Sequence, residues 1–512
     1  MADSKSLNSL FRSGDKEAFR DEVVAGVHAE NVGGAPVEIN SPLGREVGSF
    51  TVTAVNISMM IGTGIFVTPG SILKVHFLGS VGASLMVWLI GIVISFAGLA
   101  VYNEFSAWFP NRSGSEVVYL EQAYPKPKFL FPISFAVISV LLSSPLVMLL
   151  YILTAAGSPV TERGIAVACL AVVAITILIS TKWSLRITNL LAVVKTIILL
   201  FVVITGLVVL GGHTSVKDPH ANFRNAFAGT SSNGNAWSSA LIKVIFSFGG
   251  YTNANNLVNE IPNPVRTLKI YSNVALAIVS VLYMLSAVAF FAAVPKEEIR
   301  KSSLLTAALF FEKVFGNHAS ARALPALVAI SAIGNILAFS IGHVRIIREV
   351  ARQGVLPWSS FWTSTYPFAS PGGPVLLSFI LSTVIVIAPP AKDVFPFIVD
   401  LQSYPTQIFL LFMTFGLWRI RRQHRGEKPV YQAWNIAIAF TAVVAVFLIG
   451  GDVSFLWCTY IIVGIGLMGL CGVYYVVWMK FLPRLFHYRY EVDTVTLSDG
   501  SVLNELRRVK LD

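Results

Sequence analysis

Two stretches of the chain place glycines and polar residues inside otherwise apolar segments. Residues 56–70 read NISMMIGTGIFVTPG, with Gly62 and Gly64 flanking Thr63. Residues 246–256 read FSFGGYTNANN, with a Gly-Gly pair before a run of amides. Small residues also serve helix packing, but irregular backbone at membrane depth is tolerated only where it lines a protein cavity. The freed N–H and C=O groups then become ligands, so two such stretches together favour a binding site.

The two interruptions suit opposite charges. The half-helix after the first interruption starts near Gly64, where unpaired N–H groups and the positive end of the helix dipole suit a carboxylate. The half-helix before the second ends near Phe248, where free carbonyls suit an ammonium. Neither interruption carries an acidic or basic side chain, so the site suits a zwitterion such as an amino acid. The side chains that would make an apolar pocket, if they face the site, are those of Met59, Ile65, Phe246, Phe248 and Tyr251.

Composition sets the environment in which these stretches must fold. Of 512 residues, 55% are hydrophobic and 13% charged, and the mean hydropathy is +0.70. Soluble domains carry about 25% charged residues, so most of this chain faces lipid or other apolar helices. This excludes a disordered chain, a coiled coil and a nucleic-acid-binding protein. We interpret the net charge of +11 as a membrane topology signal, and the three cysteines have neither disulfide nor metal-ligand spacing.

Weakly charged stretches long enough to cross a bilayer recur along the chain. A spanning helix needs ~20 mostly apolar residues, which predicts about twelve spans. They are residues 47–73, 75–103, 129–161, 164–181, 187–216, 237–259, 270–295, 323–344, 366–391, 401–418, 429–451 and 453–479. The interrupted segments are the first and the sixth span, so each opens a block of five. Matched breaks of this kind indicate an inverted-repeat transporter with its site at the bilayer midplane.

Basic residues favour the loops that are cytoplasmic when the N-terminus is inside, most clearly in the cluster Arg419–Arg425. The prediction is therefore a cytoplasmic tail over residues 1–46, a transmembrane domain over 47–480 and a cytoplasmic tail over 481–512. We expect the mixed-charge tails, 1–46 and about 485–512, to be disordered or loosely packed. The alternative is a regulatory tail in which Lys5 or Lys16 is modified.

Several motifs together resemble the amino acid–polyamine–organocation transporters. Residues 61–66 (IGTGIF) resemble their first-helix signature, and residues 246–251 with 259–266 (NEIPNPVR) resemble their sixth helix and its cytoplasmic exit. Residues 110–120 (PNRSGSEVVYL) resemble the start of the third helix and residues 352–357 (RQGVLP) the end of the eighth. Taken in order over residues 45–480, these motifs are most similar to the L-type branch, and especially to fungal methionine permeases.

The resemblance implies an all-α polytopic membrane protein with about twelve transmembrane helices. Its expected fold is the LeuT-like five-plus-five inverted repeat with two further helices, the first and sixth helices being broken. The expected function is a secondary active plasma-membrane permease that imports neutral L-amino acids, methionine foremost, by proton symport. The rivals are an obligatory amino acid exchanger and an amino acid sensor that does not transport. We expect no enzyme activity, cofactor, metal or nucleic-acid partner.

Carried over residue by residue, the resemblance assigns the substrate site to the two interruptions. The carboxylate would bind the N–H groups of Thr63, Gly64 and Ile65, and the amine would meet the carbonyls of Ile61, Phe246 and Gly249. Phe246 would also be the aromatic lid on the outer side. Gly62, Gly250 and Tyr251 complete the predicted site, although many family members have tryptophan where this chain has Tyr251. Animal L-type members use a cysteine before the fourth span to join a heavy chain; residues 152–163 contain none, so we expect no covalent partner subunit.

Two charged residues complete the predicted machinery. A lysine in mid-span, such as Lys195, is costly and by default functional. In proton-coupled, sodium-independent relatives a lysine of the fifth span fills the place that sodium holds elsewhere, and the resemblance gives Lys195 that coupling role. The alternative is a structural lysine bonded to carbonyls of the first span. Glu260 is predicted to gate the inner side by pairing with Arg266 or another basic residue, the alternative being a solvated helix end.

Overall fold

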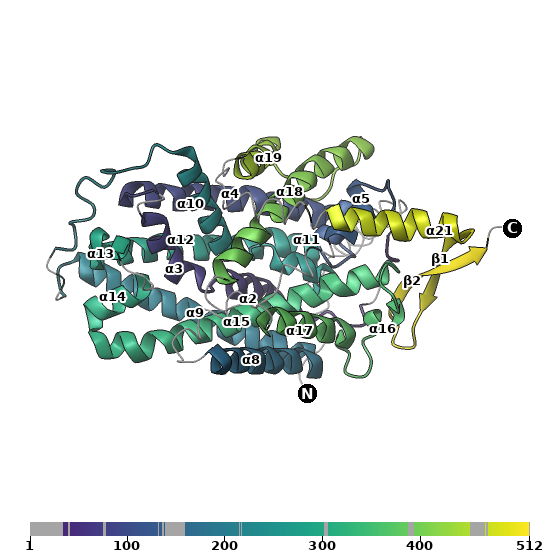
Figure 1. The fold of residues 1–512 in the computed structure, drawn as a ribbon, viewed down its shortest axis with the longest axis horizontal. Helices are drawn as coiled ribbons and strands as arrows, with labels where there is room; N and C mark the ends of the chain where they lie inside the picture. The colour runs from purple at the N-terminus through teal and green to yellow at the C-terminus, as the bar shows by residue number, and fades with distance from the viewer. Residues whose placement is uncertain are drawn as a thin grey trace, which may run out of the picture.

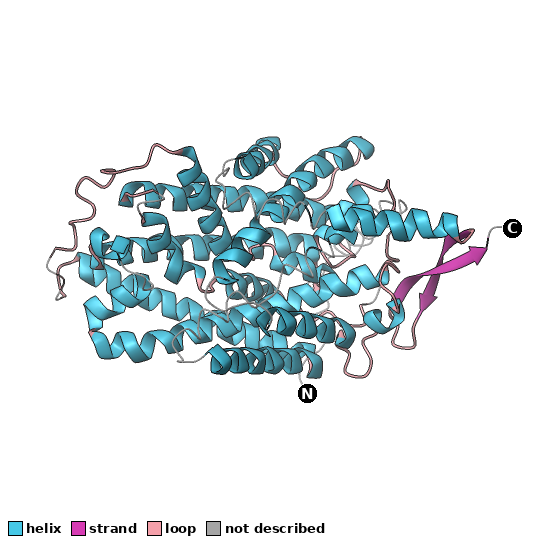
Figure 2. Ribbon diagram, in the orientation of Figure 1, coloured by secondary structure: helices cyan, strands magenta, loops and turns pink. Residues whose placement is uncertain are grey.

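Long helices run side by side along the long axis of the molecule, and a β-hairpin lies at one end (Figures 1 and 2). The computed structural model describes residues 34–38, 41–74, 78–131, 133–135, 138, 159–214, 216, 218–301, 306–387, 394–450, 466 and 469–510. The short helices α13 (Lys296–Lys301) and α14 (Thr306–Phe315) lie at the end opposite to the hairpin (Figure 1).

The remaining elements follow the chain in order. They are α2 (Ser49–Met60), α3 (Gly64–Leu73), α4 (Val81–Trp108), α5 (Glu116–Ala123), α8 (Pro159–Ile179), α9 (Thr181–Leu210), α10 (Gly234–Phe248), the 3₁₀ helix η2 (Asn253–Glu260), α11 (Pro264–Thr267), η3 (Leu268–Ser272), α12 (Asn273–Ala293), α15 (Asn317–Arg352), α16 (Ser359–Thr363), α17 (Gly372–Ile387), α18 (Val394–Gln423), α19 (Asn435–Gly450), η4 (Val477–Phe481), α21 (Leu482–Leu485), β1 (Tyr488–Thr496) and β2 (Val502–Lys510).

Four helices of the described chain are long and apolar enough to cross a membrane: Val81–Trp108, Thr181–Leu210, Pro264–Ala293 and Leu324–Arg352. The pair Ser49–Met60 and Gly64–Leu73, bent by 41°, makes a fifth if it counts as one span. Shorter apolar helices accompany them. The chain is thus an integral membrane protein of mostly helical, polytopic architecture. Of the spans predicted from the sequence, 129–161 and 453–479 fall largely outside the described residues.

Helix α9 has one face suited to lipid and one face packed against the rest of the bundle. Leu190, Ile197 and Ile204 are exposed on one side of the helix, at a spacing that keeps them on one face. An exposed apolar stripe of this length is a surface for lipid. The opposite face is buried, and Gly206 there meets α12 so closely that an added Cβ would lie 2.1 Å from the Cβ of Ala289. Small residues at helix contacts are typical of membrane bundles.

The expectation that both tails are disordered or loosely packed is wrong for their described parts. Residues 488–510 form an antiparallel hairpin in which Tyr488 pairs with Lys510 and Thr496 with Val502. In the N-terminal tail, Ala35 and Glu38 are buried. Asn504 of β2 donates a 2.6 Å hydrogen bond to Gly34 O, so the described parts of the two tails pack against each other. Lys5 and Lys16 lie outside the described residues.

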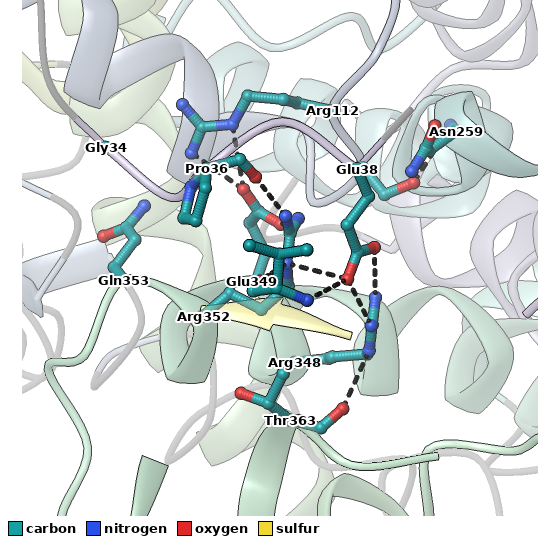
Figure 3. A network of polar contacts seen from close by, with 12 residues as sticks. Gly34, Pro36, Glu38, Arg112, Asn259, Arg348, Glu349, Arg352, Gln353 and Thr363 are labelled. Atoms are coloured by element: carbon teal, nitrogen blue, oxygen red, sulfur yellow. Dashed lines mark hydrogen bonds and ion pairs between the residues drawn. The ribbon is translucent and has the colours of Figure 1, made fainter. Parts of the chain in front are cut away.

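Buried arginines at the end of α15 hold the two tails (Figure 3). Arg348 grips the carboxylate of Glu38 with both Nη atoms, at 3.1 and 2.8 Å, and Arg352 lies 3.3 Å from the same group. Arg348 also donates to Ser501 Oγ, and Arg352 donates to Val502 O. A buried charge is costly unless it is paired. The arginines therefore need the carboxylate of the N-terminal tail and the hydrogen-bond acceptors of the C-terminal tail.

The same cluster reaches the turn before α5. Arg112, fully buried, binds Glu121 at 2.9 Å and Glu349 at 2.7 Å. Arg352 binds the other oxygen of Glu349 at 2.6 Å. Arginines and carboxylates therefore alternate across one end of the bundle. Ion pairs hold this end together, whereas apolar contacts hold the spans together.

The hairpin turn is anchored by Asp499. Its carboxylate accepts hydrogen bonds from the Thr365 N–H at 2.6 Å and the Ser501 N–H at 2.9 Å. Burial alone would raise the pKa of this carboxyl, but these bonds outweigh burial and hold the pKa at about 2. A depressed pKa means that the contact stabilises the fold above the ordinary aspartate range and is lost only as the pH falls toward 2.

We predict that Asp499→Ala weakens the packing of the hairpin on the α16–α17 connection. The free energy that stabilises this contact should fall by roughly 1–3 kcal/mol, because buried N–H donors lose a charged acceptor. Limited proteolysis of purified protein should then cut residues 488–510 faster than in the wild type. Asp493→Ala is the matched control, because Asp493 is exposed on β1. Equal cutting rates for the two variants would contradict the anchoring role.

Candidate functional site

Both predicted interruptions are present. Helix α2 ends at Met60 and α3 starts at Gly64. Helix α10 ends at Phe248, and η2 resumes at Asn253. Gly250 has a φ of +109°, a conformation that glycine adopts without strain. The sequence therefore positions each break at the glycines.

The two breaks touch each other, and glycine makes the contact possible. A Cβ added to Gly64 would lie 3.0 Å from the Cα of Ser247, and one added to Gly250 would lie 2.4 Å from Cγ of Met59. Thr68 and Ser247 also share a 2.8 Å hydrogen bond. Segments 179 residues apart in the chain are therefore in direct contact.

Tyr283 of α12 joins the ends of both broken helices. Its hydroxyl lies 2.6 Å from Met60 O and 3.2 Å from Ser247 O. The ring packs in a buried aromatic group, with Trp88 at 5.6 Å and Phe248 at 5.2 Å between centroids. The sequence analysis missed Tyr283; the available signal was a hydroxyl inside an apolar span, which needs a partner there.

The carbonyls of the first break are occupied by side chains from two other helices. Lys195 of α9, fully buried, donates to Ser58 O at 2.6 Å and to Ile61 O at 2.8 Å. Asn335 of α15 donates to Met59 O. Ser331 of α15, which the sequence analysis also missed, lies 3.2 Å from Ile61 O. The structural alternative predicted that Lys195 bonds to carbonyls of the first span, and that contact is present.

The amides of the first break are less occupied than its carbonyls. The first amides of any helix lack intrahelical acceptors, and in α3 the first bond is from Phe66 N–H to Thr63 O. Within the described chain, the buried hydroxyl of Thr63 also has no hydrogen-bond partner. With the dipole of α3 behind them, the N–H groups of Gly64 and Ile65 offer a site for an anion.

The acceptors predicted for the substrate amine are not equivalent. Ile61 O already accepts from Lys195 and Ser331. Phe246 O accepts from Gly249 N–H at 3.0 Å. Gly249 is exposed, so its carbonyl is the most accessible of the three to a ligand.

The apolar side chains near the breaks divide into two groups. Met59, Phe246 and Tyr251 keep part of their surface accessible. Ile65 and Phe248 are fully buried in the core. The first group can contact a ligand directly, whereas the second supports the breaks from behind. Among the residues described, no group of histidine, cysteine and carboxylate side chains could hold a metal ion.

Below the second break, η2 is a buried polar segment. Asn253 donates to Ala338 O at 2.7 Å, and Ala254 N–H donates to Asn56 at 2.8 Å. Glu260 at its end forms a two-point ion pair with Arg345 of α15, at 2.8 and 3.0 Å. The predicted basic partner of Glu260 therefore exists but is Arg345 instead of Arg266. Glu260 is only 1% exposed, which contradicts the alternative of a solvated helix end.

Known proteins resemble this chain over most of its length. It is 36% identical to the high-affinity methionine permease of Saccharomyces cerevisiae, over 89% of this chain and 83% of the permease. It is 28% identical to the low-affinity methionine permease of the same yeast, over 91% and 88%. With the human b(0,+)-type amino acid transporter 1 it shares 27% identity over 86% and 89%.

The sequence profile of the amino acid permease family matches residues 47–468, a range that includes both breaks, Lys195 and Glu260. The relatives are named as permeases and transporters, so this chain is a transporter and not an enzyme. This chain belongs to the amino acid permease family.

Proposed function

We propose that this chain is a secondary active permease that imports neutral L-amino acids across the plasma membrane, with methionine as the leading substrate and protons as the coupled ion. One observation carries the proposal: two broken helices meet at Gly64 and Ser247, with helix-start amides on one side and helix-end carbonyls on the other. The names of the two yeast relatives supply the substrate.

The proposed fold has about twelve spans, arranged as a LeuT-like five-plus-five repeat with two further helices. Both tails, residues 1–46 and 481–512, are proposed to be cytoplasmic, since Arg419–Arg425 follow a span directly. No covalent heavy chain is needed, because residues 152–163 lack cysteine.

Alternating access would rock the first, second, sixth and seventh spans against the rest. Contacts among these four support the idea of one moving unit. Tyr283 of α12 is bonded to α2 and α10, and Trp88 of α4 packs on Phe248 of α10 at 5.8 Å. Outside this unit, α15 supplies Arg345, whose ion pair with Glu260 would have to open for release to the cytoplasm.

The proposed substrate pose follows the polarity of the breaks. The carboxylate binds the N–H groups of Thr63, Gly64 and Ile65, and the amine meets the carbonyls of Phe246 and Gly249, with Ile61 O shared with Lys195. Phe246, half-buried, closes the site from the outer side. Gly62 and Gly250 keep the backbone open, and Tyr251 lines the side-chain space.

Lys195 is proposed to replace sodium and to tune proton coupling. Its ammonium fixes two carbonyls of the first break, so a change in its protonation would alter the geometry of the substrate amides. A cation that is part of the chain also removes the need for an external one.

The first prediction from this proposed function concerns labelled methionine uptake into vesicles reconstituted with purified protein. An inward proton gradient should drive accumulation in empty vesicles, because symport needs no internal substrate. Uptake only into methionine-loaded vesicles would make the protein an exchanger. Thermal stabilisation by methionine without any uptake would make it a sensor.

The second prediction concerns Lys195→Ala, which leaves two buried carbonyls without their charged donor. We expect gradient-driven uptake to fall at least about tenfold, equivalent to a loss of about 1.4 kcal/mol. Lys182→Ala, an exposed lysine of the same helix α9, should change uptake less than about twofold, because its surface ion pair with Glu46 contributes little. Intact pH-driven uptake in Lys195→Ala would remove Lys195 from the coupling mechanism.

A further inference from the structure

Among the described residues, one carboxyl group near Tyr251 of the second break has no basic partner. Glu116, the first residue of α5, accepts a 2.7 Å hydrogen bond from the hydroxyl of Tyr102. No ion pair in the described part of the chain includes it. Arg112, four residues earlier, directs its guanidinium to Glu121 and Glu349 instead.

Two fully buried carboxylates of the described chain are neutralised by arginine. Glu104 pairs with Arg421 at 2.5 Å, and Glu260 pairs with Arg345 at 2.8 Å. A carboxylate that is removed from water is costly unless a cation or a proton neutralises it. Glu116 is bonded to the hydroxyl of Tyr102 and not to a guanidinium. A proton is therefore the partner available to neutralise its charge. Part of its surface remains accessible, which leaves a route for that proton.

Glu116 is close to the substrate site through tyrosines. The hydroxyl of Tyr251, at the second break, lies so close to α4 that a Cβ added to Gly98 would be 2.5 Å from it. Gly98 and Tyr102 are one turn apart on the same face of α4. Within the part of the chain that the structure describes, the titratable groups that face Glu116 are Tyr102 from α4, Tyr119 from α5 and Tyr251 from the break. None of them can supply a positive charge.

Glu116 is also tied to the segment below the break. Gly114 N–H donates to Asn256 O at 3.3 Å, and Asn259 N–H donates to Ser113 Oγ at 3.1 Å. The turn before Glu116 has φ values of +100° at Gly114 and +45° at Ser115. A positive φ is unfavourable at Ser115, so these two hydrogen bonds help to hold the turn in this conformation. Movement of η2 therefore changes the surroundings of Glu116.

We propose that Glu116 is the residue that binds the co-transported proton. The carboxylate takes up one proton when substrate is bound at the breaks, and the O–H bond breaks again when η2 moves and the group meets cytoplasmic water. The inference rests on the proposed proton symport. Lys195 then holds the first break, whereas Glu116 carries the proton.

The test compares wild type, Glu116→Gln and Glu116→Asp in vesicles with labelled methionine. We expect Glu116→Gln to lose at least about tenfold in gradient-driven accumulation, with any remaining methionine counterflow independent of pH between about 5 and 7.5. Glu116→Asp should keep a pH dependence, because it keeps the carboxyl. Glu297→Gln, an exposed carboxylate of α13, is the matched control and should behave as wild type.

The arms separate the two proposals. A wild type without gradient-driven accumulation refutes proton symport itself, whereas a wild type that accumulates together with an unchanged Glu116→Gln refutes only the role of Glu116. If Glu116→Gln no longer gains thermal stability from methionine, or if it loses counterflow, the variant Tyr102→Phe tests the role of Glu116 instead. Loss of its hydroxyl destabilises the charged carboxylate, so half-maximal uptake should move about 0.5–1 pH unit upward. An unmoved profile overturns the inference.

Discussion

The structure depends on how the carbonyl groups of the first broken helix are satisfied without water. Breaking a helix at membrane depth frees backbone groups that lipid cannot bind. Here the ammonium of Lys195 bridges Ser58 O and Ile61 O, and Tyr283 and Ser331 reach the carbonyls beside them. These side chains stabilise an interruption that would otherwise be expensive, and so they keep the N–H groups of α3 in place.

That arrangement gives the break a polarity. Its acceptors are largely occupied by the protein itself, whereas among the described residues the hydroxyl of Thr63 has no partner and the first backbone bond of α3 starts only at Phe66 N–H. Helix α15 then links the break to the other end of the molecule. It supplies Ser331 near the site and Arg345 beside η2, and its last turn holds the charge cluster that binds both tails (Figure 3). One helix thus contacts the first break, η2 and both tails.

The sequence could predict features that break a local rule. Gly62, Gly64 and the Gly249-Gly250 pair interrupt apolar segments, and Lys195 is a charge where charges are rare, so each stands out alone. Tyr283 is a common residue in an apolar helix, and only its distance to two distant carbonyls reveals its role. The partner of Glu260 depends in the same way on packing between segments 85 residues apart. The hairpin had a local signal, the alternation in 488–496 and the turn at Asp499-Gly500, which high charge concealed.

The meeting of the two tails has a consequence for biosynthesis. Glu38 and Val502, whose N–H donates to the Glu38 carboxylate at 3.2 Å, are 464 residues apart in the chain. The spans can insert one by one while the chain grows, but this end of the bundle cannot close until both Glu38 and β2 have been synthesised. A chain that stops before β2 would leave the Glu38 carboxylate without the Val502 N–H and Arg352 without the Val502 carbonyl.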